Sequence, residues 1–183
     1  MTEQLTVSEY GVVSEPRALR FERLLPGPIE RVWAYLTEPE MRAKWLASGP
    51  MEPFVGGKVD LLFRHDDLSP VKEERPERFK EEEHLSKGRV TRYDPPRLLA
   101  MTWGGAPDAS EVTFELTPRD EEVLLVLTHR KIANRTEMID MAGGWHTHLA
   151  ILDDQASGRT PRPFWSTWTG IKDEYQRRLP PEE

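Results

Sequence analysis

The side chains best suited to chemistry in this chain are its histidines, and two of them, His146 and His148, are two positions apart. That spacing suggests a metal site, yet side chains two apart on a helix point about 200° apart. Helical zinc pairs use a four-residue step, so we expect no metal ion here and place His148 at the edge of an interior face. His65 precedes Asp66 and Asp67, a grouping more typical of a charged turn than of a ligand set.

A catalytic histidine needs a partner, and the sequence supplies no evident one. The chain has no cysteine and no Gly-x-Ser-x-Gly elbow, and its paired glycines lack the spacing of a phosphate-binding loop. His129 lies two residues after Leu127 and so shares a strand face with Leu125 and Leu127. We expect it either near a cavity mouth or hydrogen-bonded to the backbone at the strand end. We therefore predict no catalytic residue and no cofactor. A cyclase- or hydrolase-like enzyme using a cavity histidine as general base is the least supported interpretation.

The composition limits the partners. A formal charge of −7 over 183 residues disfavours sequence-independent binding to nucleic acid or to a membrane surface, because both need clustered Lys and Arg. No run of about 18 apolar residues is present, and the N-terminus lacks the basic and apolar regions of a signal peptide. The absence of cysteine suits a reducing compartment, so we expect a cytoplasmic protein.

A long helix is the element that must position these side chains. Its apolar stripe follows three- and four-residue steps through Met138, Met141, Trp145, Leu149, Leu152 and Ala156. Asn134-x-x-Glu137 predicts a capping box at its start, and Gly158 is typical of a helix end. Gly143 and Gly144 interrupt the helix, so we expect a close approach to a sheet there or a break.

Period-two alternation predicts the sheet on which this helix lies. The strands are expected near residues 19–24, 59–63, 88–93, 98–103, 110–117 and 123–130. The last strand is apolar on both faces and therefore central, and short turns between the later strands predict an antiparallel meander. Two short helices are expected after the first main strand, one opened by Pro28 and one by a capping box at Thr37-Glu38-Pro39-Glu40.

Three further segments flank this unit. Residues 1–16 form a polar N-terminal segment with an edge strand near Tyr10-Gly11-Val12-Val13. Residues 66–84 are charged and interrupted by proline, which favours a solvated loop over an interaction tail; their length also makes them a candidate lid. Residues 159–183 carry a helix from Pro163 whose apolar face we expect to pack on the domain or on a dimer partner.

An ordered set of motifs resembles a known family. The motifs are Pro28-Ile29-Glu30-Arg31-Val32-Trp33 with Pro39 and Trp45, Val55-Gly56-Gly57, Gly88-Arg89-Val90, Asp94-Pro95-Pro96-Arg97-Leu98, Thr102-Trp103, and Gly144-Trp145 with Leu149. Together they resemble the START-like (SRPBCC) superfamily, in the group related to the C-terminal domain of the activator of heat-shock-protein-90 ATPase. The resemblance implies an α+β helix-grip fold over residues 17–158, a curved antiparallel sheet wrapped around the long C-terminal helix. It also implies a cavity that often takes apolar ligands, but no shared reaction, because function on one fold varies with the site.

We favour non-catalytic binding of a small apolar or amphipathic ligand in a cavity between sheet and long helix. The residues expected to line it are Trp45, Phe63, Met101, Trp103, His129, Met141, Trp145 and His148. The aromatic residues would supply apolar area, and the two histidines a polar contact that orients the ligand. The alternative is a protein-interaction module that acts on a chaperone through its surface, and a homodimer is left open. A fully packed interior would favour that alternative.

Overall fold

The structure, a computed structural model, describes residues 9–77 and 83–181. Over these ranges seven strands form one antiparallel sheet in the order β1-β2-β7-β6-β5-β4-β3. The strands are β1 Val12–Glu15, β2 Ala18–Pro26, β3 Lys58–Phe63, β4 His84–Asp94, β5 Leu98–Trp103, β6 Ser110–Arg119 and β7 Glu122–Arg130. The helices are α1 Ile29–Thr37, α2 Pro39–Arg42, the short 3-10 helix η1 His65–Leu68, α3 Arg135–Ala156 and α4 Phe164–Arg178. Consecutive strands from β3 to β7 are neighbours, which confirms the predicted meander.

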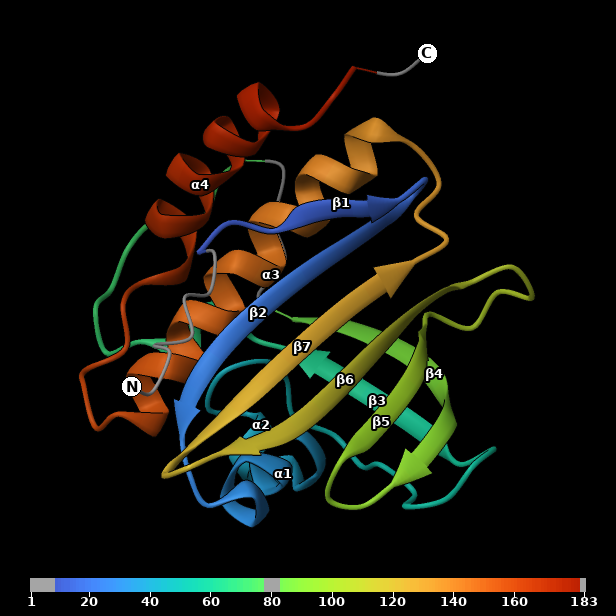
Figure 1. Cartoon of the computed structure of the whole chain (residues 1–183). Coiled ribbons are helices and arrows are strands. Elements are labelled where there is room, and N and C mark those ends of the chain that lie inside the picture. The colour runs from blue at the N-terminus through green and yellow to red at the C-terminus, as the bar shows by residue number, and fades with distance from the viewer. Residues whose placement is uncertain (1–8, 78–82, 182–183) are drawn as a thin grey trace, which may run out of the picture.

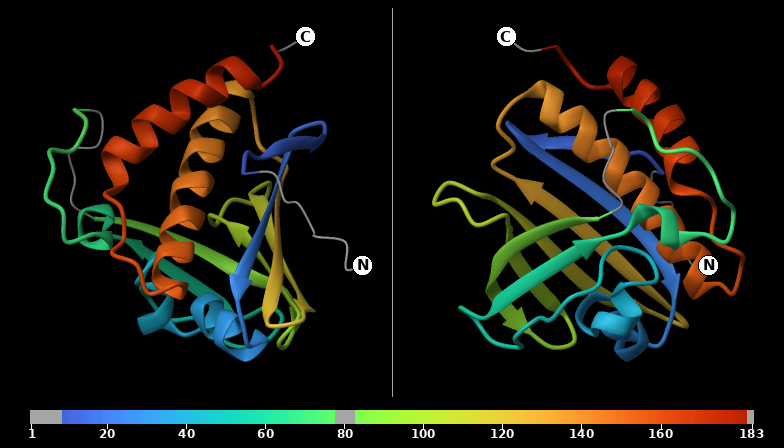
Figure 2. Two further views of the ribbon diagram at one scale, coloured as in Figure 1. Left: turned by 60° about the vertical axis from the view of Figure 1, so that its left-hand side comes forward. Right: turned by 180° about the vertical axis from the view of Figure 1, so that it is seen from behind.

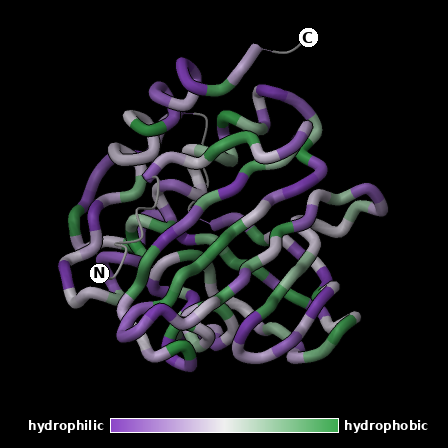
Figure 3. Tube along the Cα trace, in the orientation of Figure 1, coloured by the Kyte–Doolittle hydropathy of each residue, from purple (hydrophilic) through white to green (hydrophobic). Residues whose placement is uncertain are grey.

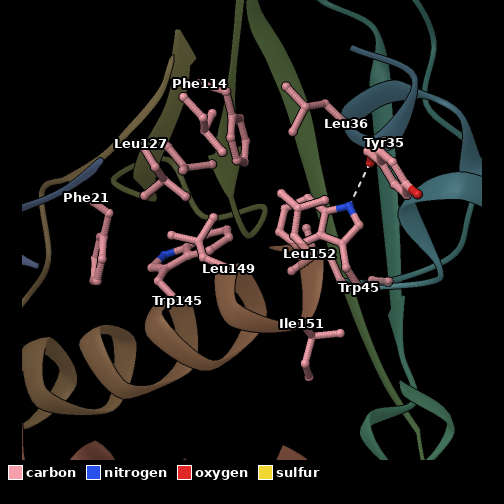
Figure 4. Close-up of a cluster of buried hydrophobic side chains, with 14 of the residues drawn as sticks. Phe21, Tyr35, Leu36, Trp45, Phe114, Leu127, Trp145, Leu149, Ile151 and Leu152 are labelled. Atoms are coloured by element: carbon pink, nitrogen blue, oxygen red, sulfur yellow. Dashed lines mark hydrogen bonds between the residues drawn. The ribbon is translucent and has the colours of Figure 1, made fainter. Parts of the chain in front are cut away.

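The long helix α3 lies against one face of the curved sheet, as Figures 1 and 2 show. Its side chains Trp145, Leu149 and Leu152 point toward the sheet, where Phe114 and Leu127 belong to the same buried cluster (Figure 4). The apolar stripe of the helix and the apolar face of the sheet are both buried when they pack against each other, so the core forms between them. The predicted α+β helix-grip fold is confirmed.

The two ends of α3 lie where the sequence predicts them. The Asn134 side chain accepts a hydrogen bond from the Glu137 backbone N–H at 2.9 Å. Gly158 has a φ of 73°, the left-handed conformation that glycine adopts without strain after a helix. The expected approach of Gly143 to the sheet, or a break there, is wrong. A Cβ at Gly143 would lie 3.3 Å from Lys172 of α4, so this glycine allows two helices to come close.

The capping box predicted at Thr37 does not form. The Thr37 hydroxyl donates instead to the Trp33 carbonyl oxygen at 2.9 Å, one turn back in α1. Glu38 is the residue before α2, and its side chain makes no capping hydrogen bond. Pro39 takes the first helical position, so Glu38 and not Thr37 is the N-cap residue, and glutamate is not among the side chains that cap well. The second helix is α2, a single turn.

The first part of the charged segment that we expected to be a solvated loop, residues 66–73, docks on the start of α4. The Ser69 hydroxyl donates to the Pro161 carbonyl oxygen at 2.7 Å, and the Trp165 indole N–H donates to Asp66 at 2.8 Å. A carboxylate oxygen of Glu73 accepts the Trp165 backbone N–H at 2.6 Å. A carboxylate at a helix start satisfies free N–H groups and interacts favourably with the helix dipole. These interactions stabilise the docked position of the segment. Residues 78–82 of the expected loop lie outside the described residues.

Helix α4 packs on α3, away from the sheet (Figure 2). Most of α4 is hydrophilic in Figure 3, but four aromatic residues are buried: Phe164, Trp165, Trp168 and Tyr175. The Tyr175 hydroxyl accepts the Gly11 backbone N–H at 2.7 Å and lies 2.7 Å from Nδ1 of His146. None of the helices in the described ranges combines the length and apolar character that crossing a bilayer requires.

Candidate functional site

A cavity of about 240 Å³ opens between α3, the start of α4 and the strands β3, β4 and β5. Most of its wall is aromatic, and we call it the aromatic cavity. Its lining residues are Phe63, His65, His84, Ser86, Trp103, Asp140, Met141, Gly144, Trp145, His148, Phe164, Trp165 and Trp168. The interior between sheet and long helix is thus not packed throughout.

Five of the eight residues expected along a cavity do line this one: Phe63, Trp103, Met141, Trp145 and His148. Phe63 and Trp103 are the last residues of β3 and β5, so their strands deliver them to the same end of the sheet. Met141, Trp145 and His148 follow four- and three-residue steps on α3 and therefore face one side.

The other three, Trp45, Met101 and His129, lie elsewhere. Trp45 is fully buried, and its indole N–H donates to the Tyr35 carbonyl oxygen at 2.8 Å (Figure 4). Met101 is buried in β5 opposite its partner Val90 in β4. Both side chains belong to the packed core, because alternation decides which face a side chain takes but not whether the space there is filled.

His129 lies behind the cavity wall in a chain of hydrogen bonds that fixes its proton. The Trp145 indole N–H donates to Nδ1 of His129 at 2.9 Å, and Nε2 lies 2.7 Å from the Ser110 hydroxyl. Burial lowers the pKa of His129 to about 4, so at neutral pH the ring holds one proton, on Nε2. Since that N–H points to Ser110, His129 has no lone pair with which to deprotonate the hydroxyl. The pair lacks the arrangement of a nucleophile and its base.

His148 has the opposite tautomer. Its Nδ1 lies 2.7 Å from the Trp45 carbonyl oxygen, which can only accept, so the proton is on Nδ1. Burial lowers the pKa of His148 to about 4, although the bond to Trp45 acts in the raising direction. At neutral pH its Nε2 is therefore an unprotonated hydrogen-bond acceptor in a side chain that lines the aromatic cavity.

His65, interpreted from the sequence as part of a charged turn, belongs to the wall. Its ring centroid lies 4.3 Å from that of Phe164, 5.4 Å from that of His148 and 5.5 Å from that of Phe63. Burial, and secondarily the nearby His148 and His84, lowers the pKa of His65 to about 3. The step of two from Phe63 to His65, which prolongs the alternation of β3, was the signal available in the sequence.

The aromatic side chains of α4 are the lining residues that sequence reasoning missed most completely. Phe164, Trp165 and Trp168 were expected only to cover the domain or a second subunit, and they form one wall of the cavity. Phe164 contacts Trp165 edge-on at 5.0 Å between centroids, and Trp165 contacts Trp168 edge-on at 6.2 Å. No local pattern relates α4 to η1, because these elements meet only through tertiary packing.

The aromatic cavity carries little charge. Asp140, the acid in its wall, lies 3.6 Å from the ammonium group of Lys172, which also lies 5.0 Å from the ring centroid of Trp168. Within the described ranges, no three histidine or acidic side chains are grouped in a way that could hold a metal ion. The chemistry that the wall offers is apolar contact together with hydrogen bonding by His65 and His148, whose lowered pKa values keep both rings neutral at neutral pH.

A family model covers most of this architecture. Residues 26–156 match the family described as activator of Hsp90 ATPase homolog 1-like protein, which is more than half of the chain. The chain belongs to this family. The matched range runs from the end of β2 to the end of α3, so α4 lies outside it.

Solved structures of similar proteins agree with this assignment. A Bordetella parapertussis protein solved by solution NMR is 41% identical with a TM-score of 0.79, over 100% of this chain and 98% of that one. CalU16 from Micromonospora echinospora is 17% identical with a TM-score of 0.62, over 87% of this chain and 86% of CalU16. A conserved Enterococcus faecalis protein of unknown function is 20% identical with a TM-score of 0.63, over 90% of this chain and 86% of that one. The last two show a common fold alone, and no curated protein matches the chain. The START-like resemblance is confirmed.

Proposed function

We propose that this protein binds a small apolar or amphipathic molecule in the aromatic cavity and does not transform it. The observation that carries the proposal is an unfilled space of about 240 Å³ whose wall is built from four tryptophans, two phenylalanines and three histidines. Side chains of this kind would close over such a space if packing alone were selected, because interiors are otherwise filled to crystal-like density. The family match covers residues 26–156, which contain the long helix and most of the sheet, and the cavity lies beside these elements.

The design of α3 supports the same proposal. A Cβ built at Gly144 would meet no atom within 4 Å, whereas one built at Gly143 would crowd α4. Gly144 also lines the cavity. A glycine in a helix interior destabilises the helix by about 1 kcal/mol relative to alanine, and at Gly144 no close contact explains it. Space for a ligand does explain it.

The test is the substitution Gly144→Leu, with Gly170→Leu as the matched control. Gly170 lies on the exposed side of α4, where an added Cβ also meets nothing within 4 Å. Both variants replace a helical glycine by a good helix former, so both should unfold at an equal or higher temperature than wild type. Only Gly144→Leu places a side chain in the cavity.

The readout is titration with the neutral fluorescent probe N-phenyl-1-naphthylamine. We expect wild type and Gly170→Leu to bind it with micromolar affinity, about −8 kcal/mol, and Gly144→Leu to bind at least about tenfold more weakly. Burial of apolar probe surface at about 25 cal/mol per Å² is sufficient for such affinity after the costs of association. If wild type does not bind the probe, or if Gly144→Leu binds it as wild type does, the proposal fails.

The family supports a second candidate, stimulation of a chaperone ATPase through surface contacts. The specific observation is that Phe54 and Val55, adjacent in the chain, are 53% and 63% exposed. The test is the ATPase rate of a purified heat-shock protein 90 with and without this protein, and with the variant Phe54→Ser. A stimulated rate that falls in the variant supports this candidate, and an unchanged rate rules it out for that chaperone.

A further inference from the structure

The aromatic cavity contains a hydrogen-bond acceptor that the protein does not satisfy. His148 donates its one proton from Nδ1 to the Trp45 carbonyl oxygen, so Nε2 keeps a lone pair in a buried side chain. Within the described part of the chain no donor is bonded to that Nε2. Nε2 of His148 is not among the fully buried polar atoms without a partner, so it is accessible from the cavity that His148 lines. A bound molecule that displaces water from it must supply a donor, or it leaves the acceptor unsatisfied.

A second ring offers complementary groups beside it. His65 lies between Phe63 and Phe164, with centroid distances of 5.5 and 4.3 Å, so its ring plane is fixed by packing. Among the residues that the structure describes, none is hydrogen-bonded to either nitrogen of His65. A neutral imidazole presents one donor and one acceptor, so His65 suits the oxygen or the proton of a hydroxyl group held by His148.

The electrostatics of the cavity favour a neutral ligand. Burial keeps the pKa of His148 at about 4 and that of His65 at about 3, so neither ring is charged at neutral pH. Asp140 in the wall already lies 3.6 Å from Lys172. An ionised ligand would lose its hydration without gaining a free counter-charge, which is strongly unfavourable in a buried site.

The shape of the wall favours a flat ring. Trp103 and Trp145 lie with centroids 5.0 Å apart and planes inclined by 56°, and Trp103 meets Phe63 edge-on at 5.8 Å. Aromatic walls with both faces and edges available bind planar rings through stacked and edge-to-face contacts. A volume of about 240 Å³ is below the range of roughly 300–1,000 Å³ typical of drug-sized ligands. One or two fused rings suit that space.

From these observations we infer that the aromatic cavity selects a neutral aromatic molecule bearing a hydroxyl or similar donor group, which hydrogen-bonds to Nε2 of His148. The inference rests on the proposed binding function and names its ligand class. The donor group fixes the orientation of the ring, and the tryptophan and phenylalanine side chains supply the apolar contact. His148 is thus a specificity-determining residue.

The test compares 1-naphthol with 1-methylnaphthalene, which has a methyl group in place of the hydroxyl, by calorimetric titration. His148→Asn retains an amide N–H at the place of Nδ1 for the Trp45 carbonyl oxygen but removes the acceptor at Nε2. His148→Gln instead places an amide oxygen near the position of Nε2 and so keeps an acceptor. Gly170→Leu, outside the cavity, is the control for unrelated changes.

The measured quantity is the ratio of the two dissociation constants, methylnaphthalene over naphthol. We expect the ratio to fall about fivefold to tenfold from wild type to His148→Asn, the effect of one buried hydrogen bond. It should stay within about twofold of wild type in His148→Gln and Gly170→Leu. If the two compounds bind but the ratio is unchanged in His148→Asn, the inference is wrong while the binding function stands. If neither compound binds wild type, both are wrong.

Discussion

The buried carboxylate of Asp154 should be the main electrostatic support of the junction between α3 and α4. Its side chain is 4% exposed and accepts three hydrogen bonds from Arg162: the backbone N–H at 3.1 Å, Nε at 2.9 Å and Nη2 at 2.9 Å. Nε of Arg159 adds a fourth at 3.3 Å. The substitution Asp154→Asn keeps the shape of the side chain and removes its charge.

The magnitude follows from these contacts. Each hydrogen bond to a charged group contributes about 1.5–3 kcal/mol, but bonds to one carboxylate do not add independently. The side chains of Arg162 and Arg159 are 43% and 53% exposed, so water can solvate them when the carboxylate is lost. We therefore expect Asp154→Asn to lower the free energy of unfolding by about 2 kcal/mol, less than the 3–5 kcal/mol of a fully buried pair. In a domain of this size that lowers the melting temperature by about 4–8 °C.

The pH dependence distinguishes this explanation from a packing defect. Burial raises the pKa of Asp154, but the hydrogen bonds from Arg162 and then Arg159 outweigh it, so the pKa lies below its ordinary value. A lowered folded pKa gives stability that is present above the unfolded pKa, about 3.9, and lost as the pH falls through the folded value. The difference between wild type and Asp154→Asn should be constant from about pH 5 to 8 and shrink below about pH 4.

The assay is urea denaturation at each pH, with Asp153→Asn as control. Asp153 is 39% exposed and pairs with Arg159 at 2.9 Å, so its loss should change stability by less than about 0.5 kcal/mol. Equal stability of the two variants at neutral pH, or a difference for Asp154→Asn that persists unchanged below pH 3, would refute the reasoning.

Two further predictions concern the helices. Trp145→Ala should lower the free energy of unfolding, measured in urea, by about 3–5 kcal/mol, because Trp145 is 3% exposed and its indole N–H is the donor to His129. An unchanged midpoint of urea unfolding would place Trp145 outside the core. Removal of residues 159–183 should reduce solubility or change the mass in solution, because it uncovers the face of α3 that α4 buries. A soluble product that light scattering shows to be monomeric would contradict this.

Much of the fold could be predicted because its signals are local. Alternation along β3 and the three- and four-residue steps of α3 each reflect burial of one face, and such a pattern can be read from consecutive residues. Predictions of helix capping were less accurate, because they depend on which hydrogen-bond partners the folded chain brings to the helix start. The capping pattern at Thr37 was present, yet the Thr37 hydroxyl bonds to Trp33 instead, and Glu73 caps a helix far along the chain. Neither outcome follows from local sequence.

The candidate site was predictable in part for the same reason. Periodicity identified the inward faces of β3, β5 and α3, and hence Phe63, Trp103 and Trp145, but it did not indicate where space remains between them. It could not separate His148, whose Nε2 is an acceptor, from His129, whose Nε2 carries a proton. That difference depends on the carbonyl oxygen of Trp45 in one case and the indole N–H of Trp145 in the other. Tautomers are decided by tertiary partners.

The position of α4 bears on how far function can be transferred within the family. The family match ends at residue 156, while Phe164, Trp165 and Trp168 of α4 form one wall of the cavity. Phe164 and Trp165 also pack on the ring of His65. The groups that would recognise a ligand are therefore supplied jointly by the shared sheet and helix and by a segment outside the match. Similarity to the Bordetella parapertussis protein extends over this segment too, since it covers the whole chain. A ligand found for that protein would be informative here, whereas one found for a relative that lacks α4 would meet a different wall.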